Sequence, residues 1–401
     1  MKEKGAINFD KAYDLVLNNC ALTGVEEILI EKSAGRILAE TLYADMDMPF
    51  FNKSAMDGFA LRSSDIKNVP VELNVLCTIK AGSREEVFIR NGTAAAVMTG
   101  APVPKGADAV VMVERTKRLK KGLVRINSSA GKGENIRVKG EEIRKGKAVL
   151  RKDKHISAPE VAVMASVGKK TVKVYKIPRV AILATGDELV PHFKNAVKGK
   201  IRNSNTPMVS VLVRSLMAEV KDLGIARDNP ADLRRKIKKG LDTDILILSG
   251  GVSMGEYDLV PRVFEECGIK KIFHKVSIKP GKPVFFGKRK HTLIFGAPGN
   301  PVSVLITFLL FIKPAIKKMS GADCSHRVLK GILARKFDTK GDRRTYFPTK
   351  VKLKDSKYHL KPINYHGSAD INAVTKADGF MVIEKGRRQV RKGEEAGFIF
   401  L

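Results

Sequence analysis

The chain has 401 residues, of which 43% are hydrophobic and 29% charged, so it is long enough for several hydrophobic cores and is not disordered by composition. Its 74 Lys and Arg outnumber its 42 Asp and Glu, which gives a formal net charge of +32. Because the basic residues are spread over the whole sequence with no arginine-rich tail, we expect a diffuse basic surface and no specific nucleic-acid site.

Apolar runs and cysteines bear on where the protein works. The longest apolar run, Val302–Ile312, is too short to cross a bilayer, and the first residues lack the apolar stretch of a secretory signal. The four cysteines form no CxxC pair and are too few to staple a chain of this size, so we expect reduced thiols. The sequence therefore predicts a cytoplasmic protein without membrane attachment. The cysteines are Cys20, Cys77, Cys267 and Cys324.

The first half of the chain predicts a helical N-terminal region that is interrupted by a β-rich insertion. Residues 1–50 begin with apolar side chains at helical spacing. Residues 51–144 contain short β-type runs separated by glycines, which predicts a β-rich domain. Residues 145–177 return to a helix that Ser157 would cap, and we expect this segment to belong with residues 1–50.

The second half of the chain predicts two further domains. Strand and helix patterns alternate over residues 178–322, which indicates an α/β domain with a mainly parallel sheet. We expect one helix from about Thr206 through residue 220, before Gly224, and expect Pro314 to kink or end the last helix. Short β-type segments in residues 323–401 predict a small β-barrel-like domain, so the fold class is α/β plus β.

Glycine-rich, charged stretches follow the predicted strands of the α/β domain. They are TGDEL (185–189), SGGVSMGEYD (249–258), KVSIKPGKP (275–283) and GAPGNPVS (296–303). Because ligands of parallel α/β sheets bind at the carboxyl ends of the strands, these stretches predict one pocket rim. The SGG turn would offer backbone N–H groups to a phosphate or another oxyanion, although an ordinary strand-to-helix turn explains it equally well on its own.

Charged side chains in the same rim favour a phosphate site. Four carboxylates would repel one another unless a divalent cation or cationic partners lie among them. Carboxylates holding Mg²⁺, with lysines facing anionic oxygens, are expected where a phosphoanhydride is cleaved. A single carboxylate in such a loop would more often be a solvated turn residue. The carboxylates are Asp187, Glu188, Asp228 and Asp258, and the lysines are Lys275, Lys279 and Lys282.

Seven segments resemble, in their order and separations, the molybdopterin molybdenumtransferase family of molybdenum cofactor insertion enzymes, to which the E domain of gephyrin belongs. The segments are SAMDGFAL, MTGAPVPKGADAVV, GENIR, ATGDEL, SGGVSMGEYD, IKPGKP and GAPGNPVSVL. The resemblance covers the chain from near Phe9 to its end. It implies an elongated multidomain chain with an N-terminal dimerisation region, an inserted β-rich domain, a central molybdopterin-binding α/β domain and a C-terminal β domain.

The resemblance also implies a reaction. Members of this family take adenylylated molybdopterin and molybdate, cleave the pyrophosphate in a Mg²⁺-dependent step and release AMP, which leaves the metal on the dithiolene as molybdenum cofactor. They are homodimers whose active site joins the α/β domain of one subunit to the inserted β-domain of the other. Small anionic ligands and other proteins of molybdenum cofactor biosynthesis are the expected partners, and tungstate is a related metal source.

Catalytic residues carry over from the family by their place in the motifs. The resemblance implies that Asp57 in SAMDG, Thr99 in MTGA and Arg137 in GENIR act across the dimer. We interpret Gly58 as the residue that lets the chain turn tightly after Asp57. Glu142 stands where the family has the aspartate of GED, so its carboxylate reaches one methylene further. The remaining implied catalytic residues are Asp187, Glu188, Asp228 and Asp258, of which Glu188 and Asp258 would hold the metal.

Substrate-binding residues carry over from the rim and from the last domain. The last domain contributes Arg344 in RTYF and Ser368 in HGSAD, where the family commonly has QGS. The rim residues would border the pterin and the oxyanion, and a dianionic molybdate needs such donors. The full set is Gly250, Gly251, Ser253, Lys275, Lys279, Lys282, Pro298, Gly299, Asn300, Pro301, Ser303, Arg344 and Ser368.

Three other interpretations are open at this point. A relative that shares only the α/β domain, such as a molybdopterin adenylyltransferase or a competence-damage-type nucleotide-processing enzyme, would lack SAMDG and the C-terminal β domain. A non-catalytic scaffold would keep the fold, but the retained carboxylate and lysine set argues against it. Nucleic-acid binding driven by charge would be steeply salt-dependent, and we expect only weak, unspecific association.

Overall fold

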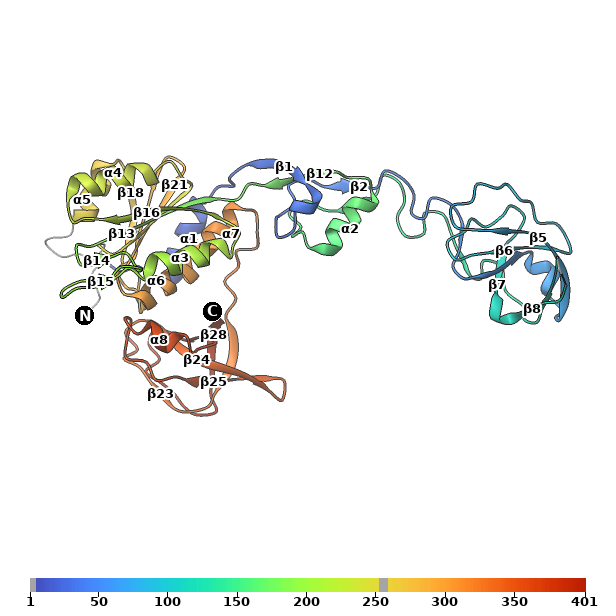
Figure 1. Cartoon of the computed structure of the whole chain (residues 1–401). Coiled ribbons are helices and arrows are strands. Elements are labelled where there is room, and N and C mark those ends of the chain that lie inside the picture. Colours follow the sequence, from blue (N-terminus) through green and yellow to red (C-terminus); the bar gives the residue numbers. More distant parts are fainter. Residues whose placement is uncertain (1–4, 121, 252–258) are drawn as a thin grey trace. The chain divides into compact units, whose positions relative to one another are not determined.

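The structure is a computed structural model that describes residues 5–120, 122–251 and 259–401. The chain forms two compact units. The first unit comprises Met1–Glu27, Gly35–Ala39 and Lys173–Leu401, and the second comprises Ile28–Ala34 and Glu40–Val172. The second unit is therefore an insertion in the chain of the first (Figure 1). The finer division into four domains stays a prediction.

The second unit is built on a six-stranded sheet in the order β7-β4-β6-β5-β9-β8. Neighbouring strands are antiparallel except for β5 and β6, which run parallel. Phe59, Val111 and Val124 form one core with their neighbours, while Ala60 and Val110 point to a second core on the other face. The strands are β4 (Gly58–Leu61), β5 (Val71–Ile79), β6 (Thr93–Val97), β7 (Ala109–Met112), β8 (Thr116–Arg118) and β9 (Leu123–Ile126).

Short ladders and one helix make up the rest of the second unit. The predicted helix is present as α2 (Ala158–Ser166), and Ser157 forms a capping box with Glu160 at its start. Short 3₁₀ turns cover Ile30–Lys32, Ser63–Ile66 and Val113–Arg115. The paired strands are β1 (Val25–Leu29) with β12 (Thr171–Tyr175), β2 (Leu42–Tyr43) with β11 (Ala148–Leu150), and β3 (Lys53–Ser54) with β10 (Ile136–Arg137).

The first unit contains the predicted α/β sheet, with the strand order β16-β13-β17-β21-β20-β18. Only β20 runs against its neighbours, so the mainly parallel sheet is confirmed. The chain passes from β13 to β16 on one side and returns to β17 on the other, which makes the β13–β17 boundary a topological switch point. The strands are β13 (Arg179–Thr185), β16 (Glu219–Ala226), β17 (Ile245–Ser249), β18 (Lys270–His274), β20 (Phe285–Arg289) and β21 (Thr292–Ala297).

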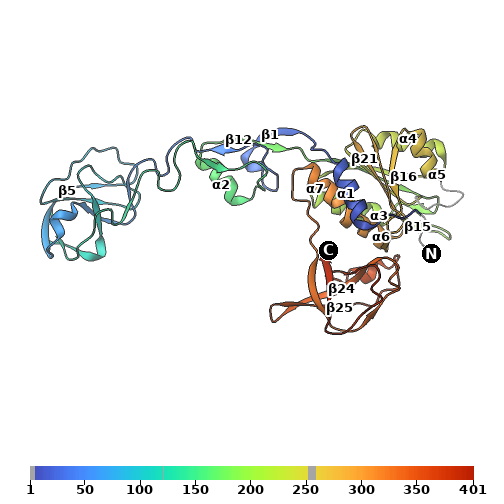
Figure 2. The same cartoon turned by 180° about the vertical axis from the view of Figure 1, so that it is seen from behind.

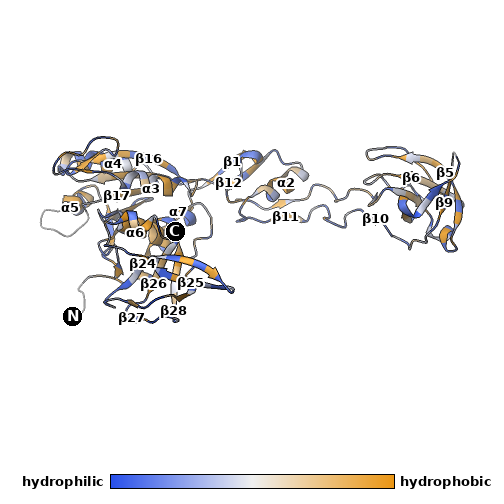
Figure 3. Ribbon diagram, turned by 60° about the horizontal axis from the view of Figure 1, so that its bottom comes forward, coloured by the Kyte–Doolittle hydropathy of each residue, from blue (hydrophilic) through white to orange (hydrophobic). Residues whose placement is uncertain are grey.

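Helices cover both faces of this sheet (Figures 1 and 2). Alternate strand residues point to opposite faces, so Val180 and Ile182 join one core and Ala181 and Leu183 the other. Figure 3 colours much of α6 orange, in agreement with its burial in the first of these cores. The first core packs against α1 (Phe9–Asn19), α3 (Asn205–Arg214), α6 (Pro301–Thr307) and α7 (Lys313–Met319), and the second against α4 (Pro230–Gly240) and α5 (Leu259–Glu266).

One helix end differs from the prediction, and of the two outcomes expected at Pro314, a kink or an end, the end does not occur. The helix expected through residue 220 stops at Arg214, because Met217 takes a left-handed φ of 60° and Glu219 already pairs with β13. The last helix does not end at Pro314. Five residues before it, Phe308–Ile312, form a π-helical turn between α6 and α7, which places Pro314 in the first turn of α7, where its missing N–H is tolerated.

The C-terminal part of the first unit is a closed barrel, as predicted. Strands β24, β25, β22, β28 and β26 pair in this order, and β26 pairs back with β24. Strand β19 (Ile278–Lys279) of the α/β part adds to β24 as a parallel neighbour. No helix of the described residues is both long and apolar enough to cross a membrane. The remaining elements are β14 (Leu189–Val190), β15 (Ile201–Arg202), β22 (Leu329–Leu333), β23 (Phe337–Asp338), β24 (Arg344–Lys354), β25 (Lys357–Pro362), α8 (Ile371–Val374), β26 (Gly379–Ile383), β27 (Gln389–Val390) and β28 (Glu395–Phe400).

Candidate functional site

Asp57 and Thr99, predicted to act together, are in direct contact in the second unit. Asp57 precedes β4 and Thr99 follows β6, and both side chains are exposed. Thr99 donates its backbone N–H and its hydroxyl to Oδ1 of Asp57 at 2.7 and 3.1 Å. Both bonds use Oδ1, so Oδ2 is available to a ligand. The contact fixes the direction of a solvent-facing carboxylate.

Gly58 is required for a reason other than the predicted tight turn. It is the first residue of β4 and lies between Val97 of β6 and Met112 of β7. A Cβ atom at this position would lie 2.1 Å from the carbonyl oxygen of Val111, which no side chain tolerates. The glycine therefore allows β7 to approach the strand that presents Asp57, and its φ is not left-handed.

Arg137 lies in the short strand β10, which follows the six-stranded sheet in the chain, and Glu142 lies in a bend after it. Arg137 pairs with Lys53 across β10 and β3, and its side chain forms an ion pair with Glu141 at 3.3 Å. The exposed Glu142 donates its backbone N–H to the carbonyl of Met48. The partner of Arg137 is thus Glu141, and the structure gives Glu142 no contact with Asp57 or Thr99 among the hydrogen bonds of the described residues. The roles of both residues stay predictions.

The rim loops of the first unit follow the carboxyl ends of its five parallel strands. Asp228 follows β16, the TGDEL stretch follows β13, and the SGG turn follows β17. Lys275 follows β18, and the GAPGN stretch follows β21. The common rim predicted from the sequence is therefore confirmed as an arrangement of strand ends, with β13 and β17 at the switch point.

Asp187 and Asp228 hold each other across the ends of two neighbouring strands. The N–H of Asp187 donates to Oδ2 of Asp228 at 3.2 Å, and the N–H of Asp228 donates to Oδ1 of Asp187 at 3.3 Å. Both side chains are exposed, as is that of Glu188. Each aspartate uses one oxygen for this exchange. The remaining oxygens and the Glu188 carboxylate are a donor set of the hard oxygen type that Mg²⁺ prefers.

Gly250 and Gly251 allow the end of β17 to lie against the end of β13. A Cβ on Gly250 would lie 2.6 Å from the carbonyl oxygen of Thr185, and one on Gly251 would lie 2.6 Å from its Oγ1. Both glycines have left-handed φ values, 93° and 64°. The hydroxyl of Thr185 is buried and has no hydrogen-bond partner within the described ranges. Among the described residues, the switch point therefore combines two glycines without side chains and a buried hydroxyl without a hydrogen-bond partner.

Asn205 is a rim residue that the sequence did not single out. Its side-chain Nδ2 donates to Oγ of Ser249 at 2.8 Å and to the carbonyl oxygen of Gly299 at 2.7 Å. The asparagine is the first residue of α3, and it ties the end of β17 to the PGNPVS stretch. The only sequence signal was an asparagine next to a helix start, which usually indicates a capping residue.

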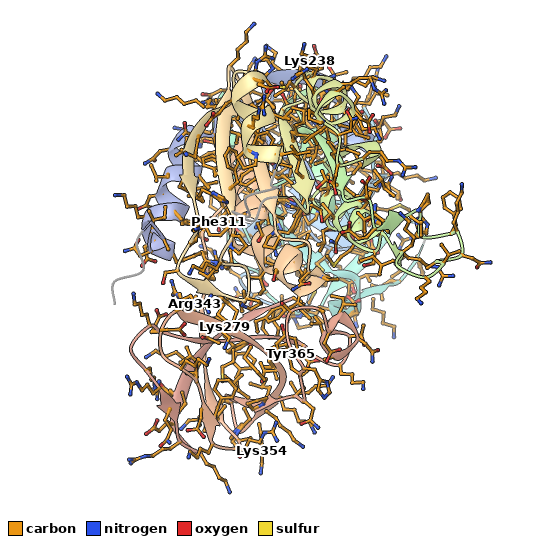
Figure 4. All side chains as sticks on the ribbon, turned by 90° about the vertical axis from the view of Figure 1, so that its left-hand side faces the viewer. Lys238, Lys279, Phe311, Arg343, Lys354 and Tyr365 are labelled. Atoms are coloured by element: carbon orange, nitrogen blue, oxygen red, sulfur yellow. The ribbon has the colours of Figure 1, made fainter. Side chains whose placement is uncertain are left out.

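A cavity of about 620 Å³ lies between the α/β part and the barrel of the first unit, within the range of about 300–1,000 Å³ that ligand sites occupy. Figure 4 shows Lys279, Arg343 and Tyr365 close together at this junction, whereas Lys354 and Lys238 lie at opposite ends of the view. Six of the predicted site residues line the cavity: Lys279, Lys282, Pro298, Asn300, Ser303 and Ser368. The barrel adds polar residues that the sequence analysis missed: Thr339, Arg343, Tyr365 and His366.

Asn300 and Ser368 join the two walls of this cavity. Nδ2 of Asn300 donates to Oγ of Ser368 at 2.8 Å, and the N–H of Val302 donates to the carbonyl oxygen of Ser368 at 3.0 Å. The second bond satisfies one of the free N–H groups at the start of α6, which Pro301 begins. The HGS stretch of the barrel is thus held against the PGNPVS stretch, and two motifs predicted to share a site are in contact.

Arg343 lines the cavity, whereas the predicted Arg344 points elsewhere. Arg344 forms ion pairs with Asp10 and Glu384 at 3.3 and 2.7 Å, and its guanidinium lies 4.6 Å from the ring centre of Phe9. Arg343 bonds Asp342 through Nε at 3.1 Å, which leaves its terminal nitrogens to an anion. Arg343 lies in the bend just before β24 and Arg344 is the first residue of the strand, and the two side chains make different contacts.

Tyr365 supplies a further donor on the barrel side. Its hydroxyl is buried and has no hydrogen-bond partner in the part of the chain that the structure describes. Burial, with a smaller contribution from Asp370, raises the pKa of Tyr365 to about 12, so the hydroxyl keeps its proton at neutral pH. A buried hydroxyl without a partner costs free energy, which an anionic ligand would recover.

Lys275 and Gly299, two further predicted site residues, accept hydrogen bonds through their backbone carbonyl groups. Lys275 has a left-handed φ of 80°, and its carbonyl accepts the N–H of Ile7 at 3.1 Å. Gly299 accepts the Asn205 bond described above. Ser253 and Asp258 lie outside the described residues. Asp258 is one of the two residues that were predicted to hold the metal. Within the described ranges, no group of three or more His, Cys, Asp and Glu side chains is arranged to hold a metal ion by itself.

Comparisons with known proteins match three consecutive regions of the chain. Residues 7–168 match the model of the MoeA N-terminal region (domain I and II), residues 181–318 the probable molybdopterin binding domain, and residues 330–401 the MoeA C-terminal region (domain IV). Because the matches lie on both sides of the α/β part, a relative that shares only that part does not account for the chain.

Curated relatives and solved structures agree with these matches. A molybdopterin molybdenumtransferase of Staphylococcus aureus is 33% identical over 405 residues, covering 100% of this chain and 96% of that protein. One of Staphylococcus epidermidis is 34% identical over 372 residues, covering 91% and 88%. The crystal structure of a molybdopterin biosynthesis MoeA protein from Pyrococcus horikosii has a TM-score of 0.84 at 31% identity, covering 98% and 99%. The chain therefore belongs to the molybdopterin molybdenumtransferase family, whose enzymes act in molybdenum cofactor biosynthesis.

Proposed function

We propose that this enzyme inserts molybdate into adenylylated molybdopterin. The pyrophosphate between the molybdopterin phosphate and AMP is cleaved in a Mg²⁺-dependent step, AMP leaves, and the metal stays on the dithiolene as molybdenum cofactor. Membership of the family supports the reaction class. The observation that carries the finer proposal is the 620 Å³ cavity in which cationic and hydroxyl donors from two parts of the chain face one space.

The cavity suits a small dianionic oxyanion such as molybdate. Lys279 of β19 and Arg343, just before the paired strand β24, supply positive charge to the cavity, and Arg343 offers two terminal nitrogens in a fixed plane. Tyr365 and Ser368 supply hydroxyl groups, and the Tyr365 hydroxyl has no other partner among the described residues. Charged donors fix the ligand by attraction, and neutral hydroxyls with set directions discriminate by geometry.

The carboxylate rim suits the pyrophosphate end of the substrate. Asp187, Glu188 and Asp228 would hold Mg²⁺ together with Asp258, and the ion would neutralise charge on the pyrophosphate oxygens. The exchange of backbone bonds between Asp187 and Asp228 orients their free oxygens before any ligand arrives. Gly250 and Gly251, which carry no side chain, would let the phosphates approach backbone N–H groups closely.

We further propose a cytoplasmic homodimer with two shared active sites. Asp57, Thr99 and Arg137 belong to the second unit and the rim and the cavity to the first, so each site would combine the first unit of one subunit with the second unit of its partner. The exposed Oδ2 of Asp57 would then meet the substrate of the other subunit. Other proteins of molybdenum cofactor biosynthesis are the expected further partners, and nucleic acid is not.

Reconstitution with defined substrates tests the reaction. Purified protein, adenylylated molybdopterin, Mg²⁺ and molybdate should yield AMP and molybdenum cofactor in equal amounts, measured by chromatography and by activation of a cofactor-free molybdoenzyme. Replacing molybdate with tungstate in parallel shows which oxyanion is preferred. AMP release without any incorporation of metal, under conditions that give both in an active relative, would contradict the proposal.

Mixing two inactive variants tests the shared site. Asp57→Ala and Glu188→Ala should each form dimers and lose cofactor synthesis. In a hybrid dimer one of the two sites receives both intact residues, so random mixing at equal amounts should restore roughly a quarter of the wild-type activity. Activity that stays at the level of the single variants, while mass spectrometry detects hybrid dimers, would show that Asp57 and Glu188 do not serve sites formed between subunits.

A further inference from the structure

A second cavity, of about 530 Å³, lies where the chain leaves α7 and enters the barrel. It is lined by α7, by residues 323–327 of the connecting segment and by the ends of β22 and β28. Figure 1 shows the C-terminus beside β28, at the end of the barrel that faces the α/β part of the first unit. The cavity contains none of the predicted site residues and plays no part in the proposed reaction.

The cavity has an excess of positive charge. Lys313 and Lys317 lie one turn apart on α7, and Arg327 lines the same space. The single carboxylate of the lining, Asp323, forms an ion pair with Arg327 at 3.1 Å. Lys317 donates to the backbone carbonyl oxygen of Asp323 at 3.1 Å. In the described part of the chain, neither lysine forms an ion pair, and the one carboxylate of the lining already pairs with Arg327, so three positive side chains face a single negative one.

Lys313 is half-buried, which makes the repulsion costly. Burial, and next the charge of Lys317, lower the pKa of Lys313 from its ordinary value. A lysine in the last turn of a helix, with its ammonium group in water, would keep its hydration and would be stabilised by the helix dipole. Lys313 is in the first turn of α7 and only partly in contact with water, so neither benefit applies to it.

Neutral groups complete the lining. Nε2 of His326 is buried and has no hydrogen-bond partner among the described residues. The imidazole lies 5.3 Å from the ring of Phe9 and 5.9 Å from that of Tyr13, measured between ring centres. Apolar side chains form the rest of the wall, and two of them are unusually open to solvent: Phe400 is 46% exposed and Leu329 is 37% exposed. An imidazole nitrogen without a hydrogen-bond partner among the described residues and two exposed apolar side chains therefore line the same cavity.

We propose that this cavity binds a small amphiphilic anion, with an apolar ring or chain and one carboxylate, sulfonate or phosphate group. The anionic group would lie between Lys313 and Lys317 and offset their repulsion. The apolar body would cover Phe400 and Leu329, which line the cavity and are partly open to solvent. The volume falls within the range of about 300–1,000 Å³ that small-molecule sites occupy, which favours a small ligand over a macromolecule.

A charged probe and its uncharged analogue test the proposal on the full-length protein. The charged probe is 8-anilinonaphthalene-1-sulfonate, and the analogue is N-phenyl-1-naphthylamine, which has the same ring system without the sulfonate. Wild-type protein should bind one sulfonate per chain, and Lys313→Met should weaken this binding by about tenfold or more. Lys354→Met makes the same change at an exposed position of the barrel (Figure 4) and should leave the affinity within about twofold.

Thermal unfolding of the free proteins provides the second measurement. Lys313→Met removes a half-buried, unpaired charge, so its melting temperature should equal or exceed that of the wild type. A fall of several degrees would show that Lys313 supports the fold and would overturn the proposal. Equal binding of both probes, several sulfonates per chain, or equal affinities of the Lys313 and Lys354 variants would overturn it as well, because each indicates a general apolar surface rather than an anion site.

Discussion

The cavity around Arg343 and the loop around Asp57 present polar side chains in two different ways. In the cavity, donors from β19, from the start of α6 and from the barrel converge because Asn300 bonds Ser368 and β19 pairs with β24. In the loop, one carboxylate is oriented by Thr99 alone and faces solvent. The first region assembles a multi-donor site within one unit by contacts between distant segments. The second region presents a single group outward, and in the proposed dimer a partner subunit would complete the site.

The largest expected effect separates the two neighbouring arginines at the start of β24, Arg343 just before the strand and Arg344 as its first residue. Arg343→Ala removes a planar cation from the cavity, and we expect cofactor formation at limiting molybdate to fall by about 100-fold, which corresponds to roughly 3 kcal/mol. A high molybdate concentration should restore part of the rate, because the lost interaction is one of binding. The measurement is the rate of cofactor formation as a function of molybdate concentration.

Arg344→Ala is the matched control for this experiment. It removes two ion pairs and the contact with Phe9, at a side chain that is only 15% exposed. We expect a loss of about 2 kcal/mol in the free energy of unfolding and an unchanged dependence on molybdate. If Arg344→Ala instead raised the molybdate requirement and Arg343→Ala did not, the assignment of the cavity arginine would be reversed.

Gly58→Ala probes the loop region through its backbone. The new Cβ would lie 2.1 Å from the carbonyl oxygen of Val111, so β4 and β7 must separate, at a cost of about 2–3 kcal/mol in the stability of the second unit. Asp57→Asn changes an exposed side chain and should alter that stability by less than about 0.5 kcal/mol. The rate of amide hydrogen exchange in β4 and β7 distinguishes the two variants, because only Gly58→Ala should separate these strands. Equal protection in Gly58→Ala and wild type would mean that the strands are not held this closely.

The rim could be predicted from the sequence because it depends on local patterns. Glycines and charges directly follow buried strands, and parallel strands end at one edge, so TGDEL and the SGG turn had to lie on the same side of the sheet. Asp57 and Thr99 were singled out only through the family resemblance, and the structure then brought them into contact. Motifs and strand order are therefore enough to predict the position of a functional side chain that directly follows its strand.

The composition of the cavity could not be predicted, because it depends on register and on contacts between distant segments. Arg343 and Arg344 are adjacent, and only the folded chain shows that Arg344 contacts Asp10, Glu384 and Phe9 while Arg343 lines the cavity. Tyr365 belongs to no motif, and its hydroxyl becomes notable only when the packing buries it without a partner. The end of α3 at Arg214 likewise follows from the pairing of Glu219 with β13, which overrides a helical pattern.

A pH experiment tests the long-range packing between α1 and the segment that enters the barrel. Burial lowers the pKa of His326 to about 4, with Arg344 and Lys313 adding to the effect and Asp10 opposing it. The unfolded chain binds this proton near pH 6.5, so stability falls as the pH drops from 6.5 to 4. We expect the loss to be about 1–2 kcal/mol after allowance for partial solvent screening. Urea unfolding at several pH values measures it.

His326→Gln should remove this part of the pH dependence, because the glutamine does not titrate. His291→Gln changes an exposed histidine of the same unit and should leave the slope as in the wild type. A slope between pH 6.5 and 4 that is the same in all three proteins would mean that His326 is protonated in the folded state, and would remove the argument for tight packing around Phe9 and Tyr13.

The smallest effect is expected from a purely local contact of the second unit, the capping box of α2. The N–H of Ser157 donates to Oε2 of Glu160 at 2.9 Å, and its hydroxyl bonds the same carboxylate. Ser157→Ala should lower the free energy of unfolding by about 1 kcal/mol at pH 7. Ser166→Ala makes the same change at the exposed end of α2 and should have almost no effect.

The pH dependence of the Ser157 effect decides whether the capping box is its cause. The hydroxyl of Ser157, and next its N–H, lower the pKa of Glu160 to about 2. A carboxylate with a depressed pKa stabilises the folded state above its unfolded pKa, about 4.5, and this contribution is lost as the pH falls toward 2. The difference between wild type and Ser157→Ala should therefore shrink from pH 4.5 to 2. A difference that stays constant over this range would assign the effect to helix propensity, because propensity does not depend on the charge of Glu160.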